Sequence, residues 1–267
     1  MTSVISGSIT LYVLAAICQG LIVFKRSNVP FLHKCTLILG GLAIIIHGLN
    51  LVENLFTEQG LSLGFYNASS LIAWFITTLG LLSSLRRPTE LMLVILFPIA
   101  ALSLICKAIL GQQELLLTHV TPGIAAHILS SILAYSVLTL AAIQAAVLQV
   151  QEYQLKHRHL KGIIQALPPL QTMEKLLFEL VWVGIILLSL AIISGAIYLE
   201  NIFAQHLVHK TLLSIAAWII FSLLLWGRHQ WGWRSQTAVR WTLGGFVVLM
   251  LGYFGSKLVL ELILKTG

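Results

Sequence analysis

Runs of about twenty apolar residues recur along the whole chain, and they constrain its fold more than any other feature. A run of this length can cross the hydrocarbon core of a bilayer as an α-helix, which satisfies every backbone polar group internally. Only 9% of the 267 residues are charged, whereas a soluble domain carries about 25%. The chain is therefore predicted to be an all-α, polytopic membrane helix bundle rather than a soluble domain with an anchor.

Charges and turn residues that bound the apolar runs predict about eight transmembrane helices in a single integral membrane domain, residues 1–267. The expected limits are 4–24, 36–56, 65–85, 90–110, 122–157, 172–199, 209–227 and 238–264. At roughly 1.5 Å per residue, the fifth helix is much longer than the roughly 30 Å of hydrocarbon. Its polar end is therefore expected to project into water.

Basic residues gather in alternate connections between the helices, which predicts the orientation of the chain. They are Lys25, Arg26, Lys34, Arg86, Arg87, Lys156, Arg158, Lys161, Arg228, Arg234 and Arg240. The positive-inside rule makes these connections cytoplasmic, so both termini are expected outside. The net charge of +7 is interpreted in the same way. We expect the lipid bilayer as the partner, and no nucleic acid.

A histidine within the fifth apolar run is the first candidate for function. An ionisable side chain inside a bilayer is costly and usually faces the bundle interior. His127 follows the helix start at 121–123, and Ser131 and Tyr135 share its helical face because all three are four residues apart. A neutral imidazole can ligate haem iron, but it can also simply hydrogen-bond across helices. Both interpretations are open, and both predict that the stripe faces inward.

A second histidine lies in the second apolar run. His47, Asn50 and Asn54 share one helical face, with Glu53 near the same outer end. They could supply a second ligand to the haem iron or line a pathway. Alternatively, they could form a network of hydrogen bonds between helices. Lys107, near the outer end of the fourth run, is expected to extend its ammonium to the interface.

Several polar residues in the outer connections are weaker candidates. His119, His206 and His209 are expected to be solvated, although each could touch a ligand. Lys210, at the start of the seventh helix, could pair with a carboxylate such as a haem propionate. Ordinary interfacial placement of this lysine is the alternative.

Tryptophans gather before the last helix, on the side predicted to be cytoplasmic. Trp226, Trp231, Trp233 and Trp241 could form a platform for a flat cofactor, with His229 as a further candidate ligand. A tryptophan belt at the membrane interface is the simpler explanation.

Several enzyme motifs are absent from the sequence. H-E-x-x-H, G-x-S-x-G and the P-loop are absent, and the three cysteines form no C-x-x-C pair. The chain is therefore not expected to be an enzyme.

Four short segments, in order, resemble landmarks of a known family. They are Thr121–Gly123 followed by His127–Tyr135, then Ile193–Tyr198, Gly232–Arg234 and Tyr253–Gly255. Together they resemble the cytochrome c assembly family of haem-handling membrane proteins, most closely its short members in bacterial inner membranes. The resemblance implies a multi-pass inner-membrane protein that binds haem. It makes His127 an outer-side ligand, His47 the family's early membrane histidine, and Lys210 a propionate contact.

The chain also departs from the family pattern. Members that deliver haem carry a W-G-x-x-W-x-W-D loop, whereas residues 200–209 contain neither tryptophan nor aspartate. The family's second outer histidine has no counterpart in 258–267, and Trp226 stands in place of an inner histidine. The resemblance thus supports haem association better than haem delivery.

Three hypotheses follow from the sequence. The first is a membrane haem-binding or haem-handling protein without the tryptophan-rich delivery loop. The second is a non-catalytic membrane partner or regulator of haem metabolism, which could use the basic tail of the fifth helix, residues 156–161, for docking. The third is a b-type electron carrier in which His47 and His127 share one haem.

Overall fold

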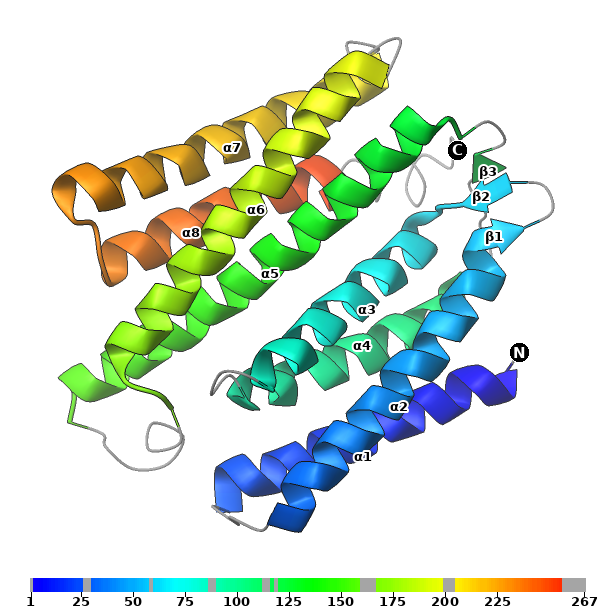
Figure 1. Cartoon of the computed structure of the whole chain (residues 1–267), viewed down its shortest axis with the longest axis horizontal. Coiled ribbons are helices and arrows are strands. Elements are labelled where there is room, and N and C mark those ends of the chain that lie inside the picture. The colour runs from blue at the N-terminus through cyan, green and yellow to red at the C-terminus, as the bar shows by residue number, and fades with distance from the viewer. Residues whose placement is uncertain are drawn as a thin grey trace. The chain divides into compact units, whose positions relative to one another are not determined.

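The computed structural model shows that the chain is built almost entirely of helices (Figure 1). It describes residues 2–25, 30–57, 60–85, 90–111, 116–117, 120–158, 167–198 and 205–255. The helices are α1 (Thr2–Lys25), α2 (Pro30–Leu55), α3 (Phe65–Ser84), α4 (Glu90–Leu110), α5 (Pro122–Lys156), α6 (Leu170–Tyr198), α7 (Gln205–Trp231) and α8 (Gln236–Met250). A π-helical turn, η2 (Leu251–Gly255), continues α8.

The all-α membrane architecture predicted from the sequence is confirmed. Among the described residues, the seven helices α1 to α7 are long and apolar enough to cross a membrane. The eighth helix, α8, has 15 residues before η2 begins, and the rest of its predicted range to 264 lies beyond the described residues. The outside location of both termini stays a prediction.

Several helix boundaries differ from the prediction by a few residues, and two of these differences have local reasons. The second helix begins at Pro30 rather than at 36, because proline has no N–H to leave unpaired in the first turn. The seventh extends to Trp231 rather than 227. It ends there because Gly232 takes a left-handed conformation (φ +64°) that terminates a helix.

A small antiparallel sheet was not predicted from the sequence. Two of its strands follow α2, and the third follows α4. Its strands β1 (Phe56–Thr57), β2 (Gly60–Ser62) and β3 (Leu116–Leu117) are ordered β1-β2-β3. Strands of two or three residues are too short to show an alternating pattern.

The described chain divides into two compact units. Unit 1 comprises residues 1–119 and 159–168, and unit 2 comprises 120–158 and 169–267. In unit 1, α1 packs against α2 and α4, and α3 packs against α4 and α2. In unit 2, α5 packs against α6 and α8, and α7 packs against α8 and α6. The single-domain organisation stays a prediction.

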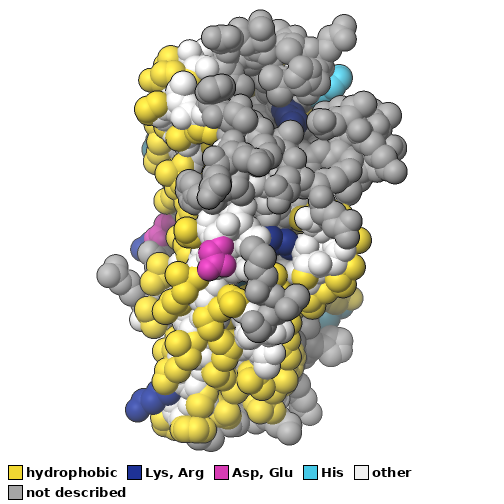
Figure 2. Space-filling view, turned by 90° about the vertical axis from the view of Figure 1, so that its right-hand side faces the viewer, with side chains coloured by type: hydrophobic (Ala, Val, Ile, Leu, Met, Phe, Trp, Pro, Cys, Tyr) yellow, Lys and Arg dark blue, Asp and Glu magenta, His cyan; other side chains and the backbone are white. Residues whose placement is uncertain are grey.

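Small residues allow close packing in unit 2, as expected for membrane helices. Ala134, Ala141 and Ala145 of α5 are completely buried, and Gly184 of α6 lies against the side chain of Leu138. On the outside, hydrophobic side chains dominate the described surface and charged ones are sparse, as Figure 2 shows for one face. That distribution suits a surface in contact with lipid chains.

Candidate functional site

His127 lies in the second turn of α5, half-buried against α6. Its Nδ1 is 2.8 Å from the backbone carbonyl oxygen of Ala191. Because a carbonyl only accepts hydrogen bonds, Nδ1 must carry the hydrogen, and a neutral ring then keeps its lone pair on Nε2. Nε2 has no hydrogen-bond partner among the described residues. Histidines that bind metals are commonly held in this way, with the non-ligating nitrogen donating to a carbonyl.

Glycine positions the imidazole on α6. A Cβ atom added to Gly195 would lie 3.0 Å from Cε1 and 3.1 Å from Nδ1 of His127, so the ring occupies the space that a side chain would need. The reverse arrangement occurs one turn away, where the ring of Tyr198 from α6 lies on Gly123 of α5. In these two contacts α5 thus supplies His127 and Gly123, and α6 supplies Gly195 and Tyr198.

The other two residues of the predicted stripe differ in their surroundings. Ser131 is half-buried, while Tyr135 is buried and donates from its hydroxyl to the carbonyl of Leu249, at the end of α8. The Tyr135 ring also packs against Tyr253 of η2, with 5.0 Å between ring centroids. These contacts tie α5 to α8 and η2.

His47 is completely buried in unit 1, and both of its ring nitrogens are hydrogen-bonded. Nδ1 is 3.2 Å from the hydroxyl of Tyr12 on α1, and Nε2 is 2.9 Å from the hydroxyl of Ser70 on α3. The arrangement joins three helices and favours the hydrogen-bond network. A role for His47 as second iron ligand stays a prediction, and it would require replacing one of these bonds.

The expectation for Lys107 is wrong. Its side chain does not reach the surface: the residue is only 9% exposed, and Nζ has no hydrogen-bond partner among the described residues. Ser8 and the amide of Asn50, also in unit 1, are buried, and their side chains make no hydrogen bond to the described part of the chain. Ser8 is one turn before Tyr12 on α1, and Asn50 is one turn after His47 on α2. These unpaired groups therefore adjoin the His47 network.

The remaining histidine and lysine candidates are not gathered into one site by the described residues. His209 is exposed and Lys210 half-buried near the start of α7, and His229 is exposed near its end. His119 and the side chain of His206 lie outside the described residues. No group of three or more His, Cys, Asp or Glu side chains able to hold a metal ion occurs in the described part of the chain.

The four tryptophans expected to cluster do form a continuous series. Ring centroids are 4.8 Å apart for Trp226 and Trp231, 5.4 Å for Trp231 and Trp233, and 5.1 Å for Trp233 and Trp241. Trp226 and Trp231 are exposed, which suits the interface between lipid and water.

A cluster of ion pairs in unit 2 was not predicted from the sequence. Glu174 of α6 is paired with both Arg228 and Arg234, two of the basic residues from which the orientation was predicted. The available signal was an acidic residue near the start of a strongly apolar helix, because such a carboxylate needs a cation.

Comparison with known proteins settles the family. The model of the family described as "Cytochrome C assembly protein" matches residues 2–264, almost the whole chain. The chain belongs to the cytochrome c assembly protein family. The resemblance seen in the sequence is therefore confirmed.

Two relatives of this cytochrome c assembly family member illustrate the match. It is 32% identical to "Inner membrane protein YpjD" of Escherichia coli (strain K12) over 233 residues, 86% of this chain and 88% of that protein. It is 28% identical to "Protein HemX" of Brevibacillus brevis over 160 residues, 59% of this chain and 54% of that protein. No solved structure matches the chain significantly. With seven apolar helices of spanning length among its described residues, the protein is a multi-pass protein of the bacterial inner membrane.

Proposed function

We propose that this protein handles haem in the membrane and that His127 holds the haem iron through Nε2. The observation that carries the proposal is the hydrogen bond from Nδ1 of His127 to the Ala191 carbonyl. It leaves on Nε2 the lone pair that iron needs, with no partner among the described residues. Membership of the cytochrome c assembly family supports haem over other ligands of imidazole.

The surrounding residues would act by orienting groups rather than by catalysis. Ala191 and Gly195 hold the imidazole. Lys210 is proposed to pair with a haem propionate, as the resemblance to the family implies. Bound haem would supply an iron centre, and the imidazole of His127 would hold it and tune its affinity for other ligands. Ser131 is proposed as a lining group, while the hydrogen bond of Tyr135 supports a role in packing.

The test is the absorption spectrum of the purified protein with haem added. We expect a Soret band in the wild type and its loss in His127→Ala, whereas His157→Ala, an exposed histidine at the other end of α5, should keep it. Imidazole added to His127→Gly should restore the band, because free imidazole can fill the space of the missing ring. A wild-type protein without a Soret band would contradict the proposal.

A non-catalytic membrane partner is the second candidate, favoured by the length of α5. At roughly 1.5 Å per residue its 35 residues exceed the bilayer core, and Tyr153 and Leu155 are exposed near its end. In that case charge reversal at Arg158 and Lys161 would abolish the protein's effect on haem metabolism, while His127→Ala would not. The third candidate, a b-type electron carrier, predicts a reversible α-band change on reduction.

A further inference from the structure

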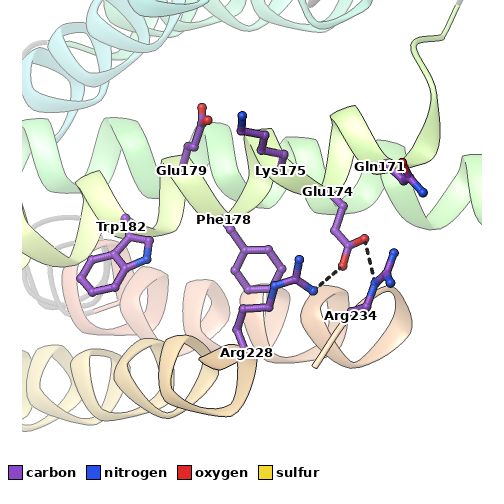
Figure 3. Close-up of a pocket in the computed structure, with 8 residues that line it drawn as sticks. All are labelled: Gln171, Glu174, Lys175, Phe178, Glu179, Trp182, Arg228 and Arg234. Atoms are coloured by element: carbon purple, nitrogen blue, oxygen red, sulfur yellow. Dashed lines mark hydrogen bonds and ion pairs between the residues drawn. The ribbon is translucent and has the colours of Figure 1, made fainter. Parts of the chain in front are cut away.

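A pocket of about 400 Å³ opens in unit 2, away from His127, between the start of α6 and the end of α7. Figure 3 shows the residues that line it, which are Gln171, Glu174, Lys175, Phe178, Glu179, Trp182, Arg228 and Arg234. The proposed haem site does not involve these residues.

Glu174 pairs with both arginines that line the pocket. Its carboxylate is nearly buried, and its two oxygens receive different guanidinium groups (Figure 3). Nη1 of Arg228 lies 3.2 Å from Oε1, and Nε of Arg234 lies 3.5 Å from Oε2. One carboxylate therefore holds two positive charges close together.

Further contacts fix Arg228. Its guanidinium lies 4.7 Å from the centre of the Phe178 ring, and Nη1 also donates to the carbonyl of Trp233 at 3.2 Å. The short loop that carries Trp233 is itself anchored, because the hydroxyl of Ser235 donates to Glu152 on α5. The guanidinium is thus held in place before any ligand arrives, which lowers the entropic cost of binding.

Positive charge is left over after these pairs are made. Three basic and two acidic side chains line the pocket. Nε and Nη2 of Arg228 and both Nη atoms of Arg234 make no hydrogen bond to the described residues. Such donors match the oxygens of a phosphate group, and guanidinium binds phosphate with two parallel hydrogen bonds.

The pocket lies at the level of the lipid headgroups. Residues 180–198 of α6 contain no charged residue, and at roughly 1.5 Å per residue they span about 28 Å, close to the hydrocarbon thickness. Residues 211–227 of α7 are likewise uncharged up to Arg228. Next to the pocket, Trp182, Ile186 and Leu190 form an exposed apolar stripe at spacings of four on α6.

We propose that this pocket binds the phosphate of an anionic phospholipid, whose acyl chains lie along the stripe from Trp182 to Leu190. The adjoining stripe favours a lipid over a soluble phosphate compound, because a soluble ligand would gain nothing from it. The excess positive charge disfavours a zwitterionic lipid, whose ammonium group would be repelled.

The test is native mass spectrometry of the delipidated full-length protein with phosphatidylglycerol or phosphatidylethanolamine of identical chains. We expect one phosphatidylglycerol bound in clear preference to phosphatidylethanolamine. Arg234→Gln should weaken this binding about tenfold, the effect of losing one charged hydrogen bond. Arg234→Lys, which keeps the charge without the paired donors, should lie between.

The matched control is Arg240→Gln, which removes the same charge from an exposed position on α8 outside the pocket. It should leave lipid binding unchanged. Equal loss in both variants, or no preference between the two lipids in the wild type, would overturn the proposal. Displacement of the lipid by millimolar inorganic phosphate would also overturn it, in favour of a soluble ligand. Arg234 is mostly exposed, and thermal unfolding without lipid would confirm that its variants fold.

Discussion

At the scale of single residues, the hydrogen bonds of the ring nitrogens distinguish the histidine proposed as an iron ligand from a histidine that joins helices. His127 donates from one nitrogen and leaves the other available, while His47 uses both. The sequence could not distinguish them, since each is a histidine in an apolar run. The difference arises from partners 64 residues away for His127, and 35 and 23 residues away for His47.

Substituting Gly195 should move the imidazole of His127 without unfolding the protein. In Gly195→Val the added Cβ would lie only 3.0 Å from Cε1 of the ring, so the ring must shift. We expect a weakened or displaced Soret band in haem titrations. Gly244→Val is the control, because a Cβ there meets no atom within 4 Å. An unchanged spectrum in Gly195→Val would show that ring position does not matter for haem.

Replacing Lys107 by methionine should stabilise the protein. A buried ammonium without a partner is costly, and methionine has a similar length without the charge. We expect Lys107→Met to raise the free energy of unfolding by about 1–3 kcal/mol, measured by thermal or denaturant unfolding in detergent. Lys156→Met, at an exposed position, should change it little. A destabilised Lys107→Met would mean that an ion or ligand meets this charge in the natural membrane.

At the scale of elements, the most informative contact is the one between α5 and the end of α8. Tyr135 hydrogen-bonds to the carbonyl of Leu249, directly before the helix changes from α to π geometry at Leu251. Gly252 of η2 lies against Leu213 of α7. The turn is therefore held from two sides within unit 2.

Tyr135→Phe should separate a packing role from a cofactor role. Loss of the buried hydrogen bond should lower the free energy of unfolding by about 1 kcal/mol or more, because the Leu249 carbonyl loses a donor. Haem titration should give the same spectrum as the wild type. Tyr153→Phe, at an exposed position, is the control for stability. A changed Soret band with unchanged stability would instead place Tyr135 at the haem.

Some of these elements could be predicted from the sequence, and others could not. Helices α1 to α7 were predictable because twenty apolar residues leave the backbone no other arrangement in a bilayer. The strands β1 to β3 were not, because each has only two or three residues, and because β3 pairs with residues of β2 that lie 56 and 54 positions earlier in the sequence. The same holds for the ion pairs of Glu174, whose arginines come from 54 and 60 residues further on.

At the scale of the whole molecule, the distribution of charge predicts the orientation in the membrane. Single cysteines placed at Ser3 and at Lys156, in a variant without Cys18, Cys35 and Cys106, would test it with a membrane-impermeant maleimide. We expect labelling of Ser3→Cys in spheroplasts and of Lys156→Cys only after lysis. Labelling of both sites after lysis controls for reactivity, and the reverse pattern would invert the assignment of sides.

The exchange of rings and glycines between α5 and α6 has a consequence for the depth of the imidazole in the bilayer. His127 occupies the place of a side chain at Gly195, and Tyr198 does so at Gly123. If either helix slid past the other by one turn, about 5.4 Å, both rings would meet side chains instead of glycine. The two ring-on-glycine contacts together therefore fix the register of α5 against α6. It sets the height of His127 along the membrane normal, and a change at any one of the four positions would require a matching change at its partner.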